Sequence, residues 1–260
     1  MRKKLFLIAA LVMSLASCKK ETSVTDNNNG GDPQPPPPTS AKLVQKMTET
    51  TNGSSTVYNF IYNGNKQLTS VKAADNSELT SFTYDNDGNI IKLESSAPGF
   101  RMVYEYVYEH GVPDRGTFKS YTIDNGAETL AEDDVIHYTV EGGKVTKINM
   151  DMNVQQQELN FLLTYDDNGN LTKVKTEGSD IYTAEFTYGT KKPIFPKVFK
   201  FVLDQAGFST QFYAKNEILS QHLDFPGTDD DVSNTNQYTY DSNGYVLTSN
   251  DGTTQTTFSY

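Results

Sequence analysis

A short motif that recurs along the chain constrains the fold more than any other feature. It reads aromatic or Leu, then Thr, Tyr, Asp, any residue, Asn or Asp, Gly, any residue and an aliphatic residue. Clean copies lie at residues 82–90, 163–171 and 238–246. Self-similar units spaced by roughly 20–50 residues are typical of repeat architectures. The weaker copies are residues 60–65, 138–143, 186–189 and 212–218, with Phe258-Ser259-Tyr260 as the start of a further copy.

Each copy predicts a β-hairpin. In the first clean copy, Phe82, Thr83 and Tyr84 alternate bulky and small polar side chains, which is the period of a strand with one buried face. Asp85 can accept backbone N–H groups within the turn. Gly88 supplies the positive φ that a short hairpin loop requires. The corresponding turn-forming residues of the other clean copies are Asp166, Gly169, Asp241 and Gly244.

The repeats predict an all-β domain of antiparallel hairpins in a curled or partly closed meander sheet. A single hairpin cannot bury its own apolar face, so neighbouring copies must pair in space. One interval departs from the pattern, because apolar residues from Phe195 to Leu203 recur at helical spacing. Pro196 suits a first turn and Gly207 a helix end. We expect a short helix near 196–205 that packs on the sheet or covers one end of it, with a buried strand at 198–203 as the alternative.

The N-terminus predicts export. Residues 2–4 are basic, and residues 5–15 form an apolar stretch interrupted only by Ser14. This stretch is shorter than the ~20 residues that span a membrane and fits the apolar region of a signal peptide. The alternatives are an ordinary signal peptide and a lipoprotein signal peptide.

The residues Leu15-Ala16-Ser17-Cys18 resemble a bacterial lipobox, and Cys18 is the single cysteine of the chain. The resemblance implies cleavage after residue 17 and lipidation of Cys18 by diacylglycerol and an amide-linked acyl chain. Several acyl chains anchor a protein stably. Lys19 follows the cysteine where an Asp would retain the protein at the inner membrane, so the analogy favours the outer membrane, on its periplasmic or its surface face.

The predicted organisation therefore has three parts. Residues 1–17 are a lipoprotein signal peptide, residues 18–40 a lipid-anchored disordered linker rich in Asn and Pro, and residues 41–260 the repeat domain. The linker composition cannot form a core, and its proline run favours extended polyproline II.

The repeat motif resembles the tyrosine–aspartate (YD) repeats of bacterial Rhs-type proteins. The acidic domain as a whole is similar to a Bacteroidetes lipoprotein domain family built on related repeats. The resemblance covers roughly residues 41–260 and implies the hairpin fold, but it implies no activity. Long Rhs chains enclose a toxin cargo, and this chain is too short for such a shell.

Composition and motifs exclude several functional classes. The formal net charge is −11, and the leader is basic, so the repeat domain repels phosphate backbones and nucleic acid is not an expected partner. Neither a nucleophile elbow, nor a phosphate-binding loop, nor a zinc-protease motif is present. His110, His137 and His222 are far apart in the sequence. We expect no catalytic residue and no cofactor beyond the lipid on Cys18.

Two groups of residues are candidates for ligand contact. Tyr104, Tyr106 and Tyr108 lie on one face of a predicted strand and would form a sugar-stacking platform if that face were exposed. We expect no metal site and a solvated acidic loop after residue 223, with a calcium site in that loop as the alternative. Its residues would be Asp224, Asp229, Asp230 and Asp231.

The sequence thus predicts a non-catalytic cell-envelope lipoprotein that binds or scaffolds an extracytoplasmic ligand, either a glycan or a protein. Its partners would be the membrane, through the lipid anchor, and that ligand. One alternative is a hydrolase acting on envelope or dietary polysaccharide, which needs two close carboxylates that the sequence alone cannot reveal. Another is a structural spacer or adhesion module.

Overall fold

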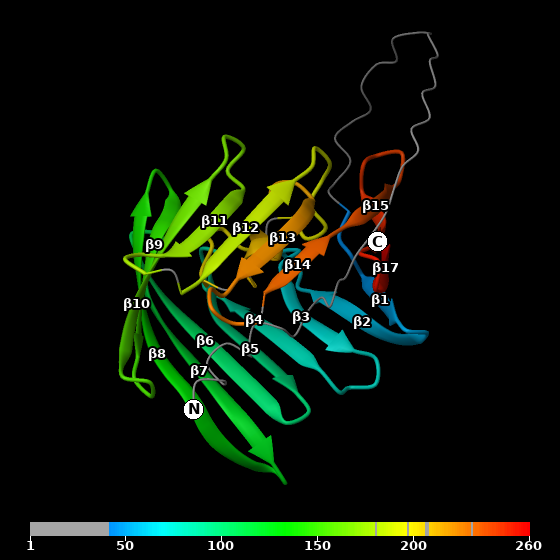
Figure 1. Cartoon of the computed structure of the whole chain (residues 1–260). Coiled ribbons are helices and arrows are strands. Elements are labelled where there is room, and N and C mark those ends of the chain that lie inside the picture. The colour runs from blue at the N-terminus through cyan, green and yellow to red at the C-terminus, as the bar shows by residue number, and fades with distance from the viewer. Residues whose placement is uncertain (1–41, 180, 197, 206–207, 230) are drawn as a thin grey trace.

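The computed structural model describes residues 42–260, except 180, 197, 206–207 and 230 (Figure 1). These residues form one 17-stranded sheet, antiparallel throughout, and one four-residue helix. The predicted all-β fold is therefore confirmed. The predicted signal peptide, lipobox and linker lie outside the described residues.

The strands follow one another along the whole described chain. They are β1 (Lys46–Thr51), β2 (Ser54–Tyr62), β3 (Leu68–Ala73), β4 (Leu79–Tyr84), β5 (Ile90–Ala97), β6 (Phe100–Glu109), β7 (Val112–Asp124), β8 (Ala127–Glu141), β9 (Lys144–Met152), β10 (Gln157–Tyr165), β11 (Leu171–Thr176), β12 (Thr183–Tyr188), β13 (Ile218–Asp224), β14 (Val232–Thr235), β15 (Gln237–Tyr240), β16 (Val246–Asn250) and β17 (Thr254–Ser259). The helix α1 (Thr210–Tyr213) lies between β12 and β13.

The sheet is nearly closed on itself. Neighbouring strands pair in chain order from β1 to β14 and from β15 to β17, and β17 pairs back onto β1, with Met47 opposite Phe258. β14 and β15 are separated by Asn236 alone, whose backbone N donates to the carbonyl O of Leu219 (2.8 Å). β14 and β15 therefore form one extended stretch, in which β14 pairs with β13 and β15 pairs with β16. Such closure confirms the predicted curled meander.

The motif produces the same turn in each clean copy. In the first, the carboxylate Oδ1 of Asp85 accepts the backbone N–H groups of Asp87 (2.9 Å) and Asn89 (2.8 Å). Gly88 has φ 75°, and its N–H donates to the Asp85 carbonyl (3.1 Å). Asp166 and Asp241 accept backbone N–H groups in the same way, and Gly169 and Gly244 also have positive φ.

Tyrosines at or near the motif position connect successive hairpins through backbone hydrogen bonds. The hydroxyl of Tyr84 donates to the carbonyl O of Leu68 (2.8 Å), where the strand after the preceding turn begins. The Tyr108 hydroxyl donates likewise to the carbonyl O of Ile90 (3.0 Å). The same bond joins Tyr62 to Val44, Tyr165 to Val145, Tyr188 to Leu171, Tyr238 to Ile218 and Tyr260 to Val246. The tyrosine hydroxyls thus form a series of links that runs around the sheet.

The short helix lies outside the predicted interval 196–205. It is α1, and the described residues of 196–205 form neither a helix nor the alternative strand. Phe199, Val202 and Leu203 are all at most 3% exposed, and residues 201–204 are buried without a break. Helical spacing predicts a helix only when one face is apolar and the other is wet, and that condition is not met here.

Residues 189–217, here called the interior segment, replace one repeat turn. Tyr188 is opposite Ile218 as Tyr84 is opposite Ile90 in the first copy. The backbone N of Gly189 donates to the Glu217 carbonyl (3.0 Å), as Asp85 N donates to Asn89 O (2.9 Å). The interior segment is therefore a long insertion at a turn position.

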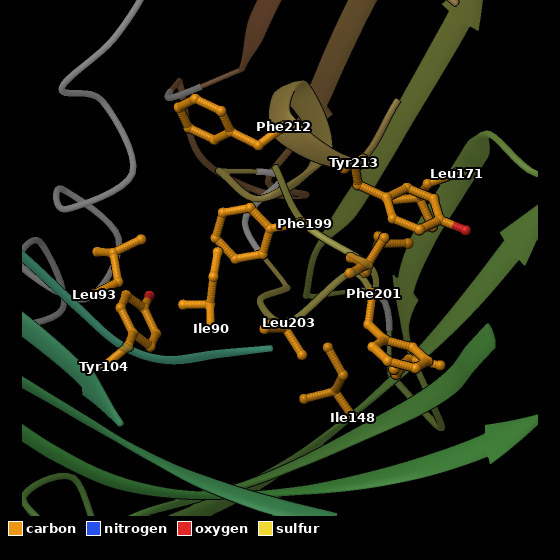
Figure 2. Close-up of a cluster of buried hydrophobic side chains, with 14 of the residues drawn as sticks. Ile90, Leu93, Tyr104, Ile148, Leu171, Phe199, Phe201, Leu203, Phe212 and Tyr213 are labelled. Carbon is orange, nitrogen blue, oxygen red and sulfur yellow. The ribbon is translucent and has the colours of Figure 1, made fainter. Parts of the chain in front are cut away.

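The interior segment supplies the centre of the hydrophobic core. Figure 2 shows Leu203 between Ile90 on one side and Ile148 on the other, with Phe199 and Phe201 in the same cluster. Aromatic contacts reach the strands as well. The ring centroids of Phe60 and Phe195 are 5.1 Å apart, and those of Phe82 and Phe212 are 5.7 Å apart. The interior segment buries many large apolar side chains against the strands. This packing is therefore the main source of the stability of the fold.

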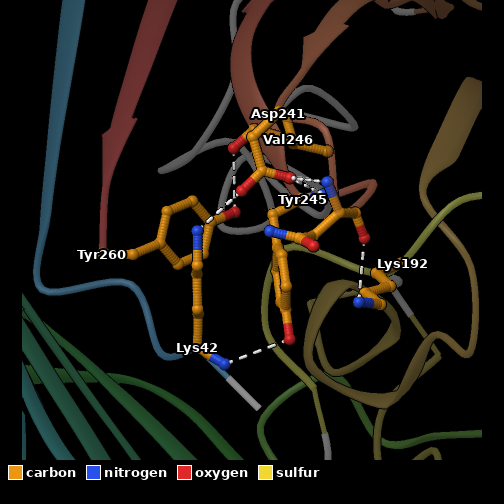
Figure 3. A network of polar contacts seen from close by, with 7 residues as sticks. Lys42, Lys192, Asp241, Tyr245, Val246 and Tyr260 are labelled. Carbon is orange, nitrogen blue, oxygen red and sulfur yellow. Dashed lines mark hydrogen bonds and ion pairs between the residues drawn. The ribbon is translucent and has the colours of Figure 1, made fainter. Parts of the chain in front are cut away.

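The three clean turns hold the interior segment in place. Lys200 Nζ donates to the Asp87 carbonyl (2.7 Å), and the Asn170 side-chain oxygen accepts the N–H of Lys215 (2.8 Å). At the third turn, Lys192 Nζ donates to the Asn243 carbonyl (2.9 Å) and lies 3.9 Å from the ring centroid of Tyr245 (Figure 3). The repeat turns therefore position the interior segment, and the repeat strands build the sheet around it.

A Gly189→Ala substitution should destabilise the protein by roughly 2–4 kcal/mol. The Glu217 carboxylate, which is 3% exposed, occupies the place where the motif has Asp, and it accepts the N–H of Lys191 (2.6 Å) and the Tyr240 hydroxyl (3.0 Å). A Cβ on Gly189 would overlap this carboxylate. Urea denaturation would measure the loss. The control is Gly64→Ala, because no atom lies within 4 Å of its added Cβ. Equal stability of the Gly189 and Gly64 variants would contradict the placement of the Glu217 carboxylate against Gly189.

Removing one tyrosine link should cost about 1 kcal/mol. Tyr84→Phe keeps the ring but leaves the carbonyl of Leu68 without its hydroxyl donor. Tyr121→Phe is the control, since that ring lies on the outer face of the sheet against Arg101 (4.3 Å). We expect a lower midpoint of thermal unfolding for the Tyr84 variant only, and a similar midpoint for both would speak against the links.

Candidate functional site

An acidic group lies on the inner face of the two longest strands, β7 and β8. Alternation along β8 turns Glu132, Asp134 and Ile136 inward, and all three are buried. Their neighbours on β7 are Ser120 and Phe118, which are opposite Glu132 and Asp134. We call Ser120, Glu132 and Asp134, together with Tyr104 of β6, the inner acidic group.

Glu132 has one hydrogen bond that partly offsets the cost of its burial. Its side chain is 9% exposed, and its Oε2 accepts the Ser120 hydroxyl (2.8 Å). Burial raises the pKa of Glu132, and the hydrogen bond from Ser120 opposes this shift. The proton affinity of this carboxylate is therefore set mainly by its removal from water.

Asp134 has no such compensation. It is 1% exposed, and neither carboxylate oxygen accepts a hydrogen bond from the described residues. Burial, with the charges of Glu132 and Asp133, raises its pKa to about 7. Its opposite residues on the two adjoining strands are Phe118 and Met152, and neither side chain can donate a strong hydrogen bond. A buried carboxylate without a partner is costly, so this group marks a functional candidate.

Tyr104 connects the acidic pair to the interior segment. Its ring stacks on Phe118, with centroids 4.4 Å apart, and on Tyr106, with centroids 5.9 Å apart. Burial raises the pKa of the Tyr104 hydroxyl well above its usual range, and the charges of Asp204, Glu132 and Asp134 add to this shift. Asp204 belongs to the interior segment, where its carboxylate accepts the N–H of Ser209 (2.6 Å). The hydroxyl therefore lies in the field of three carboxylates.

The acidic pair lies near one rim of the sheet. The backbone N of Asn153, in the turn after β9, donates to the Asp133 carbonyl (3.1 Å). Glu132 is therefore level with the end of β9, opposite the end that carries the repeat turns, while β8 and β7 extend beyond it (Figure 1).

The sequence did not single out this group. The available signal was the alternation of Glu132 and Asp134 with Ile136 and Tyr138, which assigns all four to one face of a strand.

The tyrosines expected to form a sugar platform do not form an exposed one. Tyr104 and Tyr106 are 8% and 5% exposed, and the Tyr108 hydroxyl is bonded to the Ile90 carbonyl. All three share the inward face of β6 and belong to the core cluster or pack against it. The condition under which these tyrosines would form a stacking platform is therefore not met, because the sheet curls with this side inward.

The calcium candidate receives no support from the described residues. No three His, Cys, Asp or Glu side chains among them are placed to hold a metal ion. Asp231 Oδ1 accepts the N–H of Phe225 (2.9 Å), so it closes its own loop. Asp224 lies at the end of β13, Asp229 lies in the following loop, and Asp230 is outside the described residues.

The remaining predicted residues divide into two sets. The turn-forming Asp and Gly residues lie in turns and contribute no chemistry. Leu15, Ala16, Ser17 and Cys18 are outside the described residues. In the part of the chain that is described, no helix has the length and apolar character needed to cross a bilayer.

Comparison with known proteins gives a shared fold. No protein-family model matches the chain, and no curated protein is significantly similar to it. A porin-like protein from Bacteroides vulgatus ATCC 8482 superposes with a TM-score of 0.53 at 12% identity, covering 85% of this chain and 99% of that one. A porin-like protein from Bacteroides uniformis ATCC 8492 gives a TM-score of 0.49 at 14% identity, covering 83% and 97%.

Asp134→Asn should change how stability depends on pH. The pKa of Asp134 is higher in the folded than in the unfolded chain, so its contribution is fully present below about pH 4 and is lost as the pH rises towards 7. At pH 8 the variant should be more stable than the wild type by roughly 2–4 kcal/mol, and near pH 4 the two should agree. Urea denaturation across this range would test it. A difference that does not vary with pH would show that Asp134 is not strained by its charge.

Proposed function

We propose that this protein is a non-catalytic, lipid-anchored envelope protein that binds an extracytoplasmic ligand at the inner acidic group. The observation that carries this proposal is the carboxylate of Asp134, which is buried and has no partner among the described residues. Folding alone does not favour such a group, since replacing it by an apolar residue would remove the cost of desolvation. A bound ligand would supply the missing partner.

The surrounding structure suits a binding site. The acidic group lies on two long strands within a nearly closed sheet, and the ring of Tyr104 packs against Phe118 and Tyr106. A site built on such rigid elements loses little conformational entropy on binding.

The outer face of the sheet is polar. Ion pairs cross between strands there, as between Lys173 and Glu185 (2.7 Å) and between Lys119 and Asp133 (3.6 Å). A sheet that contacts lipid directs apolar side chains outward and polar ones inward, and the described strands have the opposite arrangement. The term porin-like therefore describes the similar proteins, and for this chain we propose tethering at the outer membrane.

A hydrolase acting on polysaccharide is the second candidate. The observation that favours it is that two carboxyl groups with raised pKa, Glu132 and Asp134, share one face. One could act as an acid and the other as a base or nucleophile across a glycosidic bond. Release of reducing ends from envelope glycans by the wild type, with no release by Asp134→Asn, would favour this candidate over binding alone.

Cys18→Ala should leave an unprocessed precursor. Without the thiol, the lipobox cannot be lipidated, and cleavage after residue 17 should fail. Globomycin treatment of the wild type should also leave an uncleaved precursor, but one that carries the diacylglycerol on Cys18. Membrane fractionation and mass spectrometry would detect it. Ser14→Ala, which lies outside the lipobox, is the control and should mature normally. Normal maturation of the Cys18 variant would remove the anchor from the proposal.

The ligand can be sought with the full-length lipoprotein in detergent. A glycan array and a pull-down from envelope extracts should capture a ligand with the wild type. We expect the Glu132→Gln/Asp134→Asn double variant to lose it. The control is Asp133→Asn, which removes one carboxylate charge on the outer face of the same strand. Capture by the double variant at the wild-type level would exclude the inner acidic group as the site.

A further inference from the structure

We infer that the ligand of the inner acidic group presents a primary ammonium group, held by the carboxylates of Glu132 and Asp134 beside the ring of Tyr104. This inference rests on the proposed binding function and specifies the chemical class of its ligand.

The first argument is charge. Seven ion pairs join described residues, and neither Glu132 nor Asp134 takes part in any of them. The nearest cation on β7 is Lys119, which pairs with the outward-facing Asp133. The acidic pair therefore has no cation beside it among the described residues, although a cation would offset the cost of taking an ionised carboxylate out of water.

The second argument is hydrogen bonding. Both oxygens of Asp134 lack a donor among the described residues, while Glu132 accepts the hydroxyl of Ser120. A primary ammonium carries three N–H donors. Charge-assisted hydrogen bonds to a carboxylate are about twice as strong as neutral ones. A quaternary ammonium has no N–H and would leave the Asp134 oxygens without donors.

The third argument is the aromatic surface beside the carboxylates. Phe118 is opposite Asp134 in the register and stacks on Tyr104. Aromatic faces attract a desolvated cation. An inorganic metal ion is less well suited, since no three carboxylate, imidazole or thiolate side chains among the described residues are grouped to hold one. Carboxylates and rings together favour an amine on an organic ligand.

The test compares small probes with the full-length lipoprotein in detergent at pH 8. Butylammonium carries the primary ammonium, 1-butanol is its neutral counterpart, and tetramethylammonium is a cation without N–H donors. Calcium chloride tests a metal. Ligand-observed NMR and isothermal titration calorimetry would report affinity. We expect butylammonium to bind at least ten-fold more tightly than 1-butanol or tetramethylammonium.

Variants locate the probe on the protein. Butylammonium binding should be lost in Glu132→Gln/Asp134→Asn and retained in Asp133→Asn. The single variant Asp134→Asn, expected above to be more stable at this pH, separates loss of binding from loss of folding. Equal binding of butylammonium and 1-butanol, binding unchanged in the double variant, or displacement of butylammonium by calcium would each overturn the inference.

The outcome also distinguishes this inference from the proposed function. If butylammonium fails to bind but an envelope ligand captured by the wild type depends on Asp134, the ammonium assignment is wrong and the binding function stands. If no captured ligand depends on Asp134 either, both are wrong.

Discussion

The hydrogen bond from a motif tyrosine to the preceding hairpin is the interaction on which the rest of the structure depends. Tyr84 reaches Leu68 in this way, and the same link recurs around the sheet. Each link joins hairpins that are neighbours in the sequence. Hairpins that are only marginally stable alone are therefore joined into a sheet that closes on itself. Tyr138 departs from this rule and donates to the Leu203 carbonyl of the interior segment (2.8 Å). There the tyrosine joins the wall to the core, and Gly116 leaves room for its hydroxyl, since an added Cβ would lie 3.3 Å from it.

The sequence predicted the hairpin turns, which depend on contacts within a few residues. It did not predict which side chains become buried when the sheet curls. Asp85 and Gly88 specify a turn through contacts within a few residues, so the hairpins could be predicted. Leu203 and its apolar neighbours have helical spacing, but residues 201–204 are buried without a break, and no local pattern reports that. Glu132 and Asp134 were missed for the same reason: a carboxylate on a strand is normally outside, and only the curl of the sheet turns these two inward.

The two ends of the enclosed space have different characters. At the end with the repeat turns, the interior segment fills the space with aromatic rings and is held by Lys200 and Asn170. Near the other rim, the wall presents Glu132 and Asp134 beside Tyr104. Apolar packing at one end can offset uncompensated charge at the other, because both act on the same cooperative sheet. Stability and recognition can therefore be located in separate halves of one domain.

The substitution of a turn by the interior segment has a consequence for how such domains diversify. Tyr188 and Ile218 keep the pairing of an ordinary copy although a long excursion separates them, and Glu217 restores the carboxylate that Gly189 lacks. The sheet thus accepts an inserted segment at a turn without a change in the pairing of its strands. Each remaining turn on that side is a point at which evolution, or an engineer, could graft a new loop while leaving the frame intact.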